Sequence, residues 1–478
     1  MTAKFKDMSR RSTLPDKAMI VFLCFLVSSA YSIGSLQGQV STSLPSGIQA
    51  TATRTLLNGL RIEILAAPHS ARISLHLLIG AGSVFDPQDK AGLAELTVAT
   101  LVDSVPDWQG DPGEIGKVVE AGKKFQYEVD WDSTHLFTEC RAEEIGIYLQ
   151  ALTRFVRYTT LSPVRFETVR NRLMKSATEE TSSPRQIAER RFESELFRGN
   201  PYARPLKGTT VSLKNIAFGD TVNFQKRYHL PNVSYLSMVG PVQEDAVRRQ
   251  AGRSLGVWIM DKAFPYTFTP PQGIRELRLL TVNGNPAAET VLVIGQLMVP
   301  RSSTEFVSAE LLAHILQSAR WESCPEVSPS IELAGRRLKG FVRVSVQKQG
   351  LPVGKVLSEV RQRWRQLAQT GPSVEECGQA VQRYLEITKE QAGAAPFLAR
   401  MLCMADTYQL GFNFFERLKQ TLPRTTPADL RLSAQKLLTP DQLLAVVSGP
   451  LNPSDLEVLK KEGWRISSMD SVGPTAKP

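Results

Sequence analysis

Apolar and polar residues alternate with period two over residues 59–65 and 73–79, and again over residues 278–282 and 290–295. This alternation is typical of half-buried β-strands. The first two segments flank a His-Ser turn, and the last two flank an Asn-Gly-Asn-Pro turn at residues 283–286. Each half of the chain is therefore predicted to open with a pair of strands.

The same order of elements follows each strand pair. An apolar helix is predicted over residues 92–102 and 306–316, then a strand over residues 125–129 and 340–346, then an amphipathic helix over residues 143–156 and 353–368. A further helix begins near a Ser-Pro step at residue 162 and a Pro-Ser step at residue 372. Both halves close in an apolar strand that ends in Gly-Pro, at Gly240 and at Gly449.

This shared order indicates an internal duplication of an α+β unit of about 200 residues, which is too long a repeat for a solenoid. The predicted fold is α+β, with two duplicated lobes, each a mostly antiparallel sheet covered by helices, facing each other across a cleft. Breaks rich in Pro, Gly and Ser suggest the boundaries. They are a signal peptide at 1–32, a linker at 33–53, an N-terminal lobe at 54–255, an inter-lobe linker at 256–275, a C-terminal lobe at 276–452 and a tail at 453–478.

The N-terminal segment has the order of a secretory signal. Basic residues precede an apolar run at residues 18–27, and small residues follow it. The run is short for a bilayer span, and Asp7 and Asp16 are unusual in a mitochondrial transit peptide. We expect export to the periplasm or the cell exterior, with cleavage near Ser32. An uncleaved N-terminal membrane anchor is the alternative.

Composition and charge exclude several classes of protein. The chain of 478 residues is 42% hydrophobic and 22% charged, which excludes disorder and a coiled coil. The formal net charge is +10, but the basic stretches at residues 190–191 and 361–365 lie in helix-like sequence, where we expect a solvated face and no nucleic-acid partner. The 5 cysteines show no C-x-x-C spacing, so neither a redox pair nor a thiolate metal site is predicted.

Several short motifs occur in an order known from a peptidase family. They lie at residues 57–61, 80–83, 92–94, 200–209 and 224–233. With them, the chain resembles the insulinase/pitrilysin family of zinc metallopeptidases, in particular its mitochondrial-processing-peptidase-like branch, from about residue 54 to residue 452. The resemblance implies a two-lobed fold and, in catalytic members, a zinc site on the helix that begins Gly-Leu-Ala.

In that family the helix carries H-x-x-E-H, whose histidines bind zinc while the glutamate activates the metal-bound water. The resemblance places the first histidine at Glu95, the base at Val98 and the second histidine at Ala99. The third ligand, a glutamate on a later helix, falls on Ser176, or on Lys175 if the alignment shifts by one residue. Because Val98 cannot titrate, Ala99 has no donor atom and a lone Glu95 cannot retain zinc, the resemblance implies a lost metal site, no cofactor and no catalytic residue.

Other side chains do not restore the ligand set. The histidines include no pair three or four residues apart, although distant ones could meet in space. We expect each to be a turn, strand or interface histidine, namely His69, His76, His135, His229 and His314. The acidic residues Glu128, Asp130 and Asp132 lack the glycine and the closing glutamate of a calcium loop, so we expect a solvated strand-to-turn edge there.

The resemblance also implies where substrate contacts would lie. Catalytic members carry an Asn-Ala on the strand after a glycine pair, and here Phe125 or Gln126 stands at that place. Their second lobe contributes an Arg and a Tyr. Arg320 is either a remnant of that arginine or an ordinary surface residue, and no tyrosine matches. The candidate substrate-binding residues are therefore Gln126 and Arg320.

The expected function follows from two features, a retained two-lobed fold and a lost zinc site. We expect an insulinase-family peptidase-like protein that is catalytically inactive and acts as the non-catalytic partner of an exported, zinc-bearing paralogous peptidase subunit. Extended peptides are expected in the cleft, since a peptide backbone can add to a sheet edge. Membrane contact is expected only if the signal stays uncleaved. The alternatives are an active zinc metallopeptidase with a non-standard site and a stand-alone envelope peptide-binding or scaffold protein.

Overall fold

The computed structural model describes residues 54–158, 161–180, 183–282, 289–326, 329–411 and 414–469. The predicted signal peptide, the linker at 33–53, the turn at 283–286 and the end of the tail lie outside these ranges. No helix within them is both long enough and apolar enough to cross a bilayer.

The first sheet has six strands in the spatial order β1-β2-β6-β3-β5-β4. Their bounds are β1 (Arg54–Thr55), β2 (Arg61–Ala66), β3 (Ile73–Ile79), β4 (Gln126–Val129), β5 (Thr134–Cys140) and β6 (Ser234–Gly240). β6 pairs parallel to β2 and antiparallel to β3, and the other pairings are antiparallel. The predicted pairing of β2 with β3 is therefore wrong. β6 lies between them because this continuous apolar strand is buried on both faces and takes the centre of the sheet.

The second sheet repeats this order as β12-β7-β11-β8-β10-β9. Its strands are β7 (Arg278–Val282), β8 (Thr290–Met298), β9 (Ser330–Ala334), β10 (Gly340–Lys348), β11 (Leu444–Ser448) and β12 (Arg465–Met469). The duplicated α+β architecture is confirmed. However, the predicted strands at 125–129 and 340–346 are not equivalent, because β4 corresponds to β9 whereas β10 corresponds to β5, a strand that the pattern missed. Residues of the predicted tail form β12, which pairs with β7.

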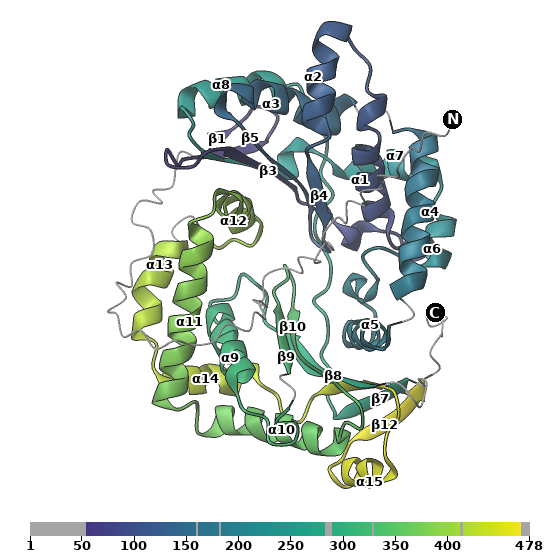
Figure 1. Ribbon diagram of the computed structural model, residues 1–478, viewed down its shortest axis with the longest axis vertical. Helices are drawn as coiled ribbons and strands as arrows, with labels where there is room; N and C mark the ends of the chain where they lie inside the picture. Colours follow the sequence, from purple (N-terminus) through teal and green to yellow (C-terminus); the bar gives the residue numbers. More distant parts are fainter. Residues whose placement is uncertain are drawn as a thin grey trace, which may run out of the picture.

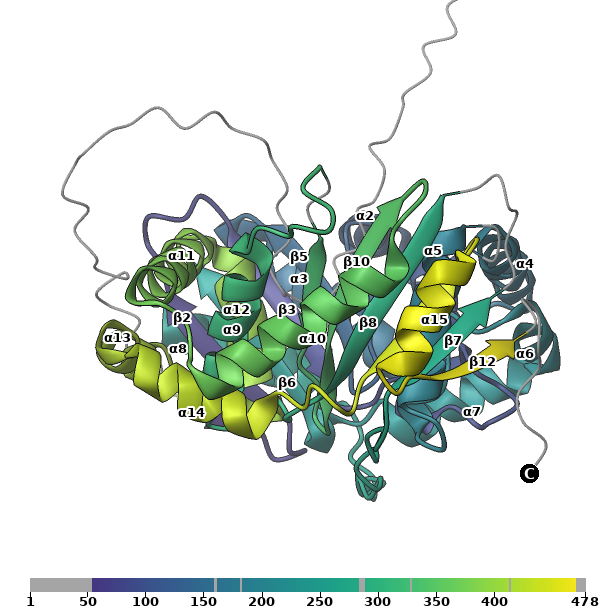
Figure 2. The ribbon, with the colours of Figure 1, turned by 90° about the horizontal axis from the view of Figure 1, so that it is seen from below.

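The helices pack mainly on the outer face of each sheet. In the first half they are α1 (Leu93–Asp103), α2 (Pro112–Gly122), α3 (Ile145–Thr153), α4 (Pro163–Glu180), α5 (Pro184–Leu196), α6 (Thr210–Asn215), α7 (Phe218–Tyr228) and α8 (Glu244–Leu255). In the second half they are α9 (Phe306–Ser318), α10 (Val353–Gln369), α11 (Val374–Ala392), α12 (Ala395–Thr407), α13 (Phe414–Thr421), α14 (Pro427–Leu437) and α15 (Pro453–Lys461). Figure 2 shows α10, α14 and α15 across the outer side of the second sheet.

The predicted helix starts agree with local capping chemistry. Ser373 caps α11, since its side chain accepts a hydrogen bond from the main-chain nitrogen of Glu376, and the Glu376 side chain accepts one from the main-chain nitrogen of Ser373. This reciprocal capping box satisfies two main-chain donors that a helix leaves free. It explains why the Pro-Ser step identified this helix from the sequence.

Two helices cross from one lobe to the other (Figure 1). α5 of the N-terminal half packs on β8 and β11 of the second sheet, whereas α12 of the C-terminal half packs on β3 and β6 of the first. Phe192 and Leu196 of α5 share a core with residues of the second sheet, and Leu398 and Ala399 of α12 share a smaller core with the first. The two helices therefore fill the predicted cleft where it lies over the central strands of each sheet. Each lobe buries apolar residues of the other.

Candidate functional site at the lobe interface

Helix α1 is held rigidly at the place where the family resemblance puts the metal site. Asp86 accepts hydrogen bonds from the main-chain nitrogens of Gly92, at 2.8 Å, and of Ala94, at 2.9 Å. Gly92 has φ +92°, and a Cβ added there would lie 2.8 Å from the main-chain nitrogen of Gly208, so a side chain would not fit. Every residue of the helix from Leu93 to Leu101 is buried. The Gly-Leu-Ala start thus fixes α1 firmly in the first lobe.

The three α1 positions that would carry the H-x-x-E-H side chains differ in what they contact. Glu95 is buried and its Oε1 accepts a hydrogen bond from the Tyr127 hydroxyl on β4 at 3.2 Å. Burial raises the pKa of Glu95, opposed by Lys207, by the Tyr127 hydrogen bond and by Arg172. Val98 and Ala99 have no exposed surface and belong to the apolar core of the first lobe.

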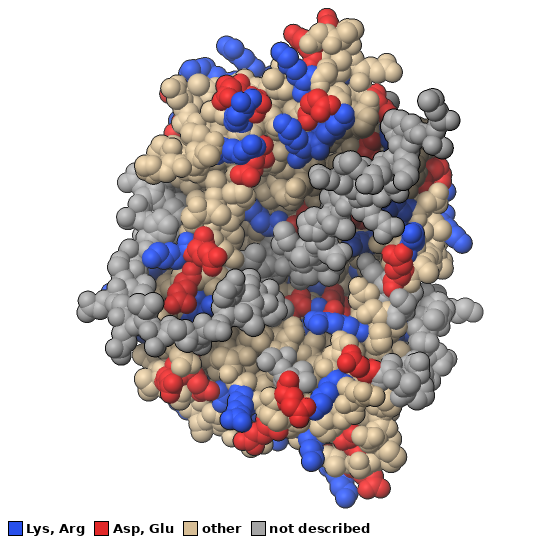
Figure 3. All heavy atoms as spheres, in the orientation of Figure 1, with Lys and Arg blue, Asp and Glu red and all other residues tan. Residues whose placement is uncertain are grey.

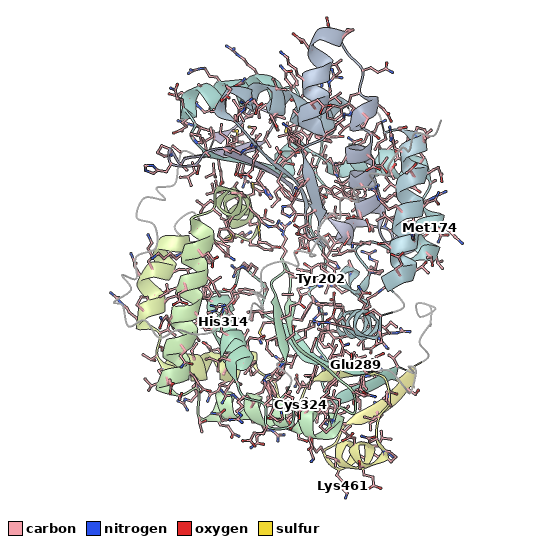
Figure 4. All side chains as sticks on the ribbon, viewed as in Figure 1. Met174, Tyr202, Glu289, His314, Cys324 and Lys461 are labelled. Carbon is pink, nitrogen blue, oxygen red and sulfur yellow. The ribbon has the colours of Figure 1, made fainter. Side chains whose placement is uncertain are left out.

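Helix α4 packs beside α1, as the family frame requires. Ser176 is half-buried on α4, and Lys175 is exposed and pairs with Glu179 at 3.9 Å. Met174, on the same helix turn, packs against the core of the first lobe and is labelled in Figure 4. The four family positions on these two helices therefore carry one carboxylate, one hydroxyl and two apolar side chains, a donor set that does not fit zinc. Within the described residues, no three His, Cys, Asp or Glu side chains are grouped so that they could share a metal ion.

The two candidate substrate-binding residues lie in different lobes. Gln126 is exposed at the start of β4, the edge strand of the first sheet. Arg320 is exposed just beyond the end of α9, and no hydrogen bond or ion pair joins it to Gln126 in the described parts of the chain. The edge strand itself is tied to the other lobe, because the two terminal guanidinium nitrogens of Arg400 on α12 donate to the Glu128 carboxylate, at 2.8 and 2.9 Å.

A buried carboxylate that sequence reasoning misjudged joins both lobes. Asp132 is 2% exposed, and its Oδ1 accepts hydrogen bonds from the hydroxyls of Tyr202, at 2.6 Å, and Tyr266. Its Oδ2 accepts from the main-chain nitrogen of Arg337, in the β9–β10 connection, at 2.8 Å. Burial and the neighbouring Asp130 raise the pKa of Asp132, against the tyrosine hydrogen bonds. The expected solvated edge is therefore wrong, because the second lobe and the linker cover this turn. Figure 4 labels Tyr202 between the lobes.

Two histidines that are distant in sequence meet beside the neighbouring Asp130 carboxylate. His76 Nε2 and His135 Nδ1 are 2.8 Å apart, on the neighbouring strands β3 and β5. His135 Nε2 faces Asp130 at 3.2 Å and the Ser133 hydroxyl at 2.9 Å. Burial, and then His135, lower the pKa of His76 well below its ordinary value. Burial acts to raise the pKa of Asp130, but the hydrogen bonds from His135 and Ser133 outweigh it and lower this pKa.

A stacked arginine from the second lobe completes the interface. The Arg336 guanidinium lies 3.6 Å from the centre of the Trp131 ring and contacts Glu193 of α5 at 3.1 Å. Arg343 on β10 pairs with the same Glu193 at 3.1 Å and with Glu332. A planar guanidinium suits such stacking and pairing in a buried position. Of these residues, Glu332 and Arg343 lie on strands otherwise rich in apolar side chains, which is a sequence signal, whereas Trp131 and Arg336 lie in loops and Glu193 lies on α5.

Comparison with known proteins agrees with the duplicated frame. Residues 61–210 match the model of the family described as Insulinase (Peptidase family M16). A segment of 201 residues is 24% identical to cytochrome b-c1 complex subunit 1, mitochondrial, of Caenorhabditis elegans, and covers 42% of this chain and 42% of that protein. The match thus spans less than half the length of that curated relative.

Solved structures share the fold over most of the chain. The peptidase M16 inactive domain from Pseudomonas fluorescens superposes with a TM-score of 0.76 at 16% identity, over 84% of this chain and 98% of that one. A protease from Helicobacter pylori gives 0.74 at 14% identity, over 84% and 99%. The first half of the periplasmic protease PqqL from Escherichia coli gives 0.68 at 16% identity, over 87% and 96%. The resemblance to the insulinase family is confirmed. Residues 61–210 carry the match to that family, and most of the chain shares the two-lobed fold of the similar structures.

Proposed function

We propose that this chain is a catalytically inactive subunit of an exported peptidase complex, in which a zinc-bearing relative performs the cleavage. The observation that carries the proposal is the retained packing of α1 on α4 around side chains that cannot bind zinc. Val98 and Ala99 have no exposed surface, and the acid at the remaining position, Glu95, is engaged with Tyr127. The packing of the two helices is retained while the zinc-binding atoms are absent, as expected of a subunit whose role is structural.

Names of similar proteins support this role. One relative is named as a subunit of a mitochondrial complex, and one similar structure is described as an inactive domain of its family. Another similar structure is described as half of a periplasmic protease, in agreement with the export expected from the N-terminal sequence. Acidic and basic side chains are interspersed over both lobes on the face in Figure 3, so charge there favours no highly charged ligand.

The edge of the first sheet supplies the proposed contact with peptide. β4 is the last strand of its sheet, and the exposed Gln126 begins it. An extended peptide adds to such an edge through main-chain hydrogen bonds. The Arg400–Glu128 contact keeps this edge at a fixed distance from α12. In this role the chain positions extended substrate, and the partner supplies metal and base.

The test is purification of the full chain from its native host through a C-terminal tag, followed by zinc analysis and a peptide-cleavage assay. We expect a co-purifying protein with H-x-x-E-H, zinc in the complex, and none retained by this chain alone after dialysis. Glu95→Gln should leave cleavage by the complex unchanged, whereas Glu→Gln within the partner's motif should abolish it. Stoichiometric zinc and cleavage by the lone chain would instead establish an active peptidase. A partner-free monomer that binds peptide would establish a stand-alone binding protein.

A further inference from the structure

An exposed apolar surface lies where the chain enters the first lobe. It is formed by the turn between β1 and β2 and by the segment that follows α8. Its side chains and their exposed fractions are Leu57 105%, Val257 43%, Ile259 72% and Met260 53%. We call these four residues the apolar tip. The exposure of Leu57 shows that the tip projects from the surface and does not line a groove.

The main chain beneath the apolar tip is firmly held. Asn58 Nδ2 donates to the carbonyl oxygens of Leu255 and Trp258, each at 2.9 Å, and so joins the turn to the segment after α8. Trp258 is 3% exposed and its Nε1 donates to the His229 carbonyl oxygen at 3.2 Å. Asn232 Nδ2 donates to the Asp261 carbonyl oxygen at 3.1 Å. The tip is therefore presented by a fixed backbone, so its exposure does not come from a loose loop.

Cations flank the residues of the apolar tip along the chain. Residues 54–59 and 249–262 contain four of them against a single carboxylate, Asp261. The cations are Arg54, Arg249, Arg253 and Lys262, all exposed. In the described part of the chain none of the four forms an ion pair, in contrast to Arg248, which pairs with Asp245. A projecting apolar group flanked in the sequence by exposed cations matches the interface of an anionic bilayer, where apolar side chains enter below the headgroups and cations meet phosphates.

We propose that this surface docks the protein onto an anionic lipid bilayer. A protein partner would need a preformed cavity to receive the projecting apolar tip. Lipid headgroups are displaced by such a tip, so a bilayer needs no preformed cavity. The apolar run at residues 18–27 lies upstream of Arg54 in the sequence. The docking surface acts whether or not the run is removed, and it is independent of the partner role proposed above.

The experiment is co-sedimentation of the purified full chain with vesicles of phosphatidylcholine alone or mixed with phosphatidylglycerol, at low and high salt. We expect binding to the mixed vesicles that weakens with salt. The triple variant Leu57→Ser/Ile259→Ser/Met260→Ser should lose at least about tenfold in binding. Arg249→Gln/Arg253→Gln should lose about fivefold per cation, with a smaller salt dependence. Comparing variants within one chain cancels any contribution from the N-terminal run.

Matched controls come from exposed residues elsewhere. Val374 and Leu432 are 80% and 51% exposed, and Val374→Ser/Leu432→Ser should bind vesicles as the parent does. Lys355→Gln controls for charge. Equal vesicle binding by the triple variant and the parent, or no binding by either, overturns the proposal. A dimer in sedimentation velocity that the triple variant abolishes, without any vesicle binding, would overturn it and assign the surface to a second copy of this chain.

Discussion

The main-chain nitrogen of Arg337 in the C-terminal lobe donates to the Asp132 carboxylate in the N-terminal lobe at 2.8 Å. The hydroxyls of Tyr202 and Tyr266 donate hydrogen bonds to the other oxygen of the same carboxylate. Each oxygen is therefore satisfied, and every donor comes from a different segment of the chain. One buried acid thus fixes how the two lobes and the linker meet.

Replacing this acid by its amide should weaken the interface. In Asp132→Asn the side-chain amide would turn an N–H toward either the Arg337 nitrogen or the tyrosine hydroxyls, and leave a buried donor unsatisfied. We expect a loss of roughly 1–3 kcal/mol in the free energy of unfolding, measured by urea titration. Asp89→Asn, at an exposed position, is the control and should cost little. Equal stability of both variants would mean that the network contributes nothing to lobe association.

The buried acid Glu63 should make stability depend on pH. It is 2% exposed on β2, and burial, and then the charge of Asp406, raise its pKa from 4.5 to about 8, against the effect of Arg61. The folded state holds this proton more tightly than the unfolded chain does, so the stability linked to it is full below about pH 4.5 and is lost as pH rises through about 8. The expected slope approaches 1.4 kcal/mol per pH unit.

Glu63→Gln tests this linkage, because glutamine resembles the protonated acid and cannot titrate. Urea unfolding at several pH values from 5 to 8 measures the free energy of unfolding. This free energy should fall less steeply with pH in the variant than in the parent, because the variant lacks the one proton that Glu63 binds. The exposed Glu114→Gln is the matched control and should follow the parent. Parallel curves for Glu63→Gln and the parent would assign the pH dependence to other groups.

Truncating the anchor of α5 should uncouple the lobes. Phe192 has no exposed surface and packs against Phe341, with ring centres 5.9 Å apart, inside the core of the second sheet. We expect Phe192→Ala to cost roughly 3–5 kcal/mol and to broaden or split the unfolding transition. Calorimetry and urea titration measure both. Val374→Ala, at an exposed site, should leave a single unshifted transition.

Restoring the zinc ligands and the base of the family should test whether the family resemblance places them at the correct positions of this chain. The variant Glu95→His/Val98→Glu/Ala99→His/Ser176→Glu places two histidines one turn apart on α1 and a carboxylate on the adjoining α4. Without metal we expect a loss of roughly 1–3 kcal/mol, because Val98 and Ala99 lie in a filled core. Zinc should then raise the midpoint of unfolding of this variant and not of the parent. A variant that folds but ignores zinc would show that the positions are misaligned.

Local patterns along the chain were sufficient for much of the architecture. Hydrophobic periodicity predicted the strand at 73–79 and the helices that became α1 and α9, and a short apolar run predicted the strand that ends at Gly240, because burial acts residue by residue. The step at Ser373 marked the start of α11 through a capping box within four residues. The motif at 92–94 located the family helix and the side chains that replace its ligands.

Tertiary structure alone decided which strands pair and which polar residues are buried. The parallel pairing of β2 with β6, the contact of His76 with His135 and the crossing of α5 and α12 join segments far apart in the chain. Asp132 looks like a solvated turn residue in the sequence, and only the covering lobe and linker make it a buried acid. Hydrophobic periodicity reports that a face is buried, whereas the partner that buries it is set by the packing of whole elements, which no local window contains.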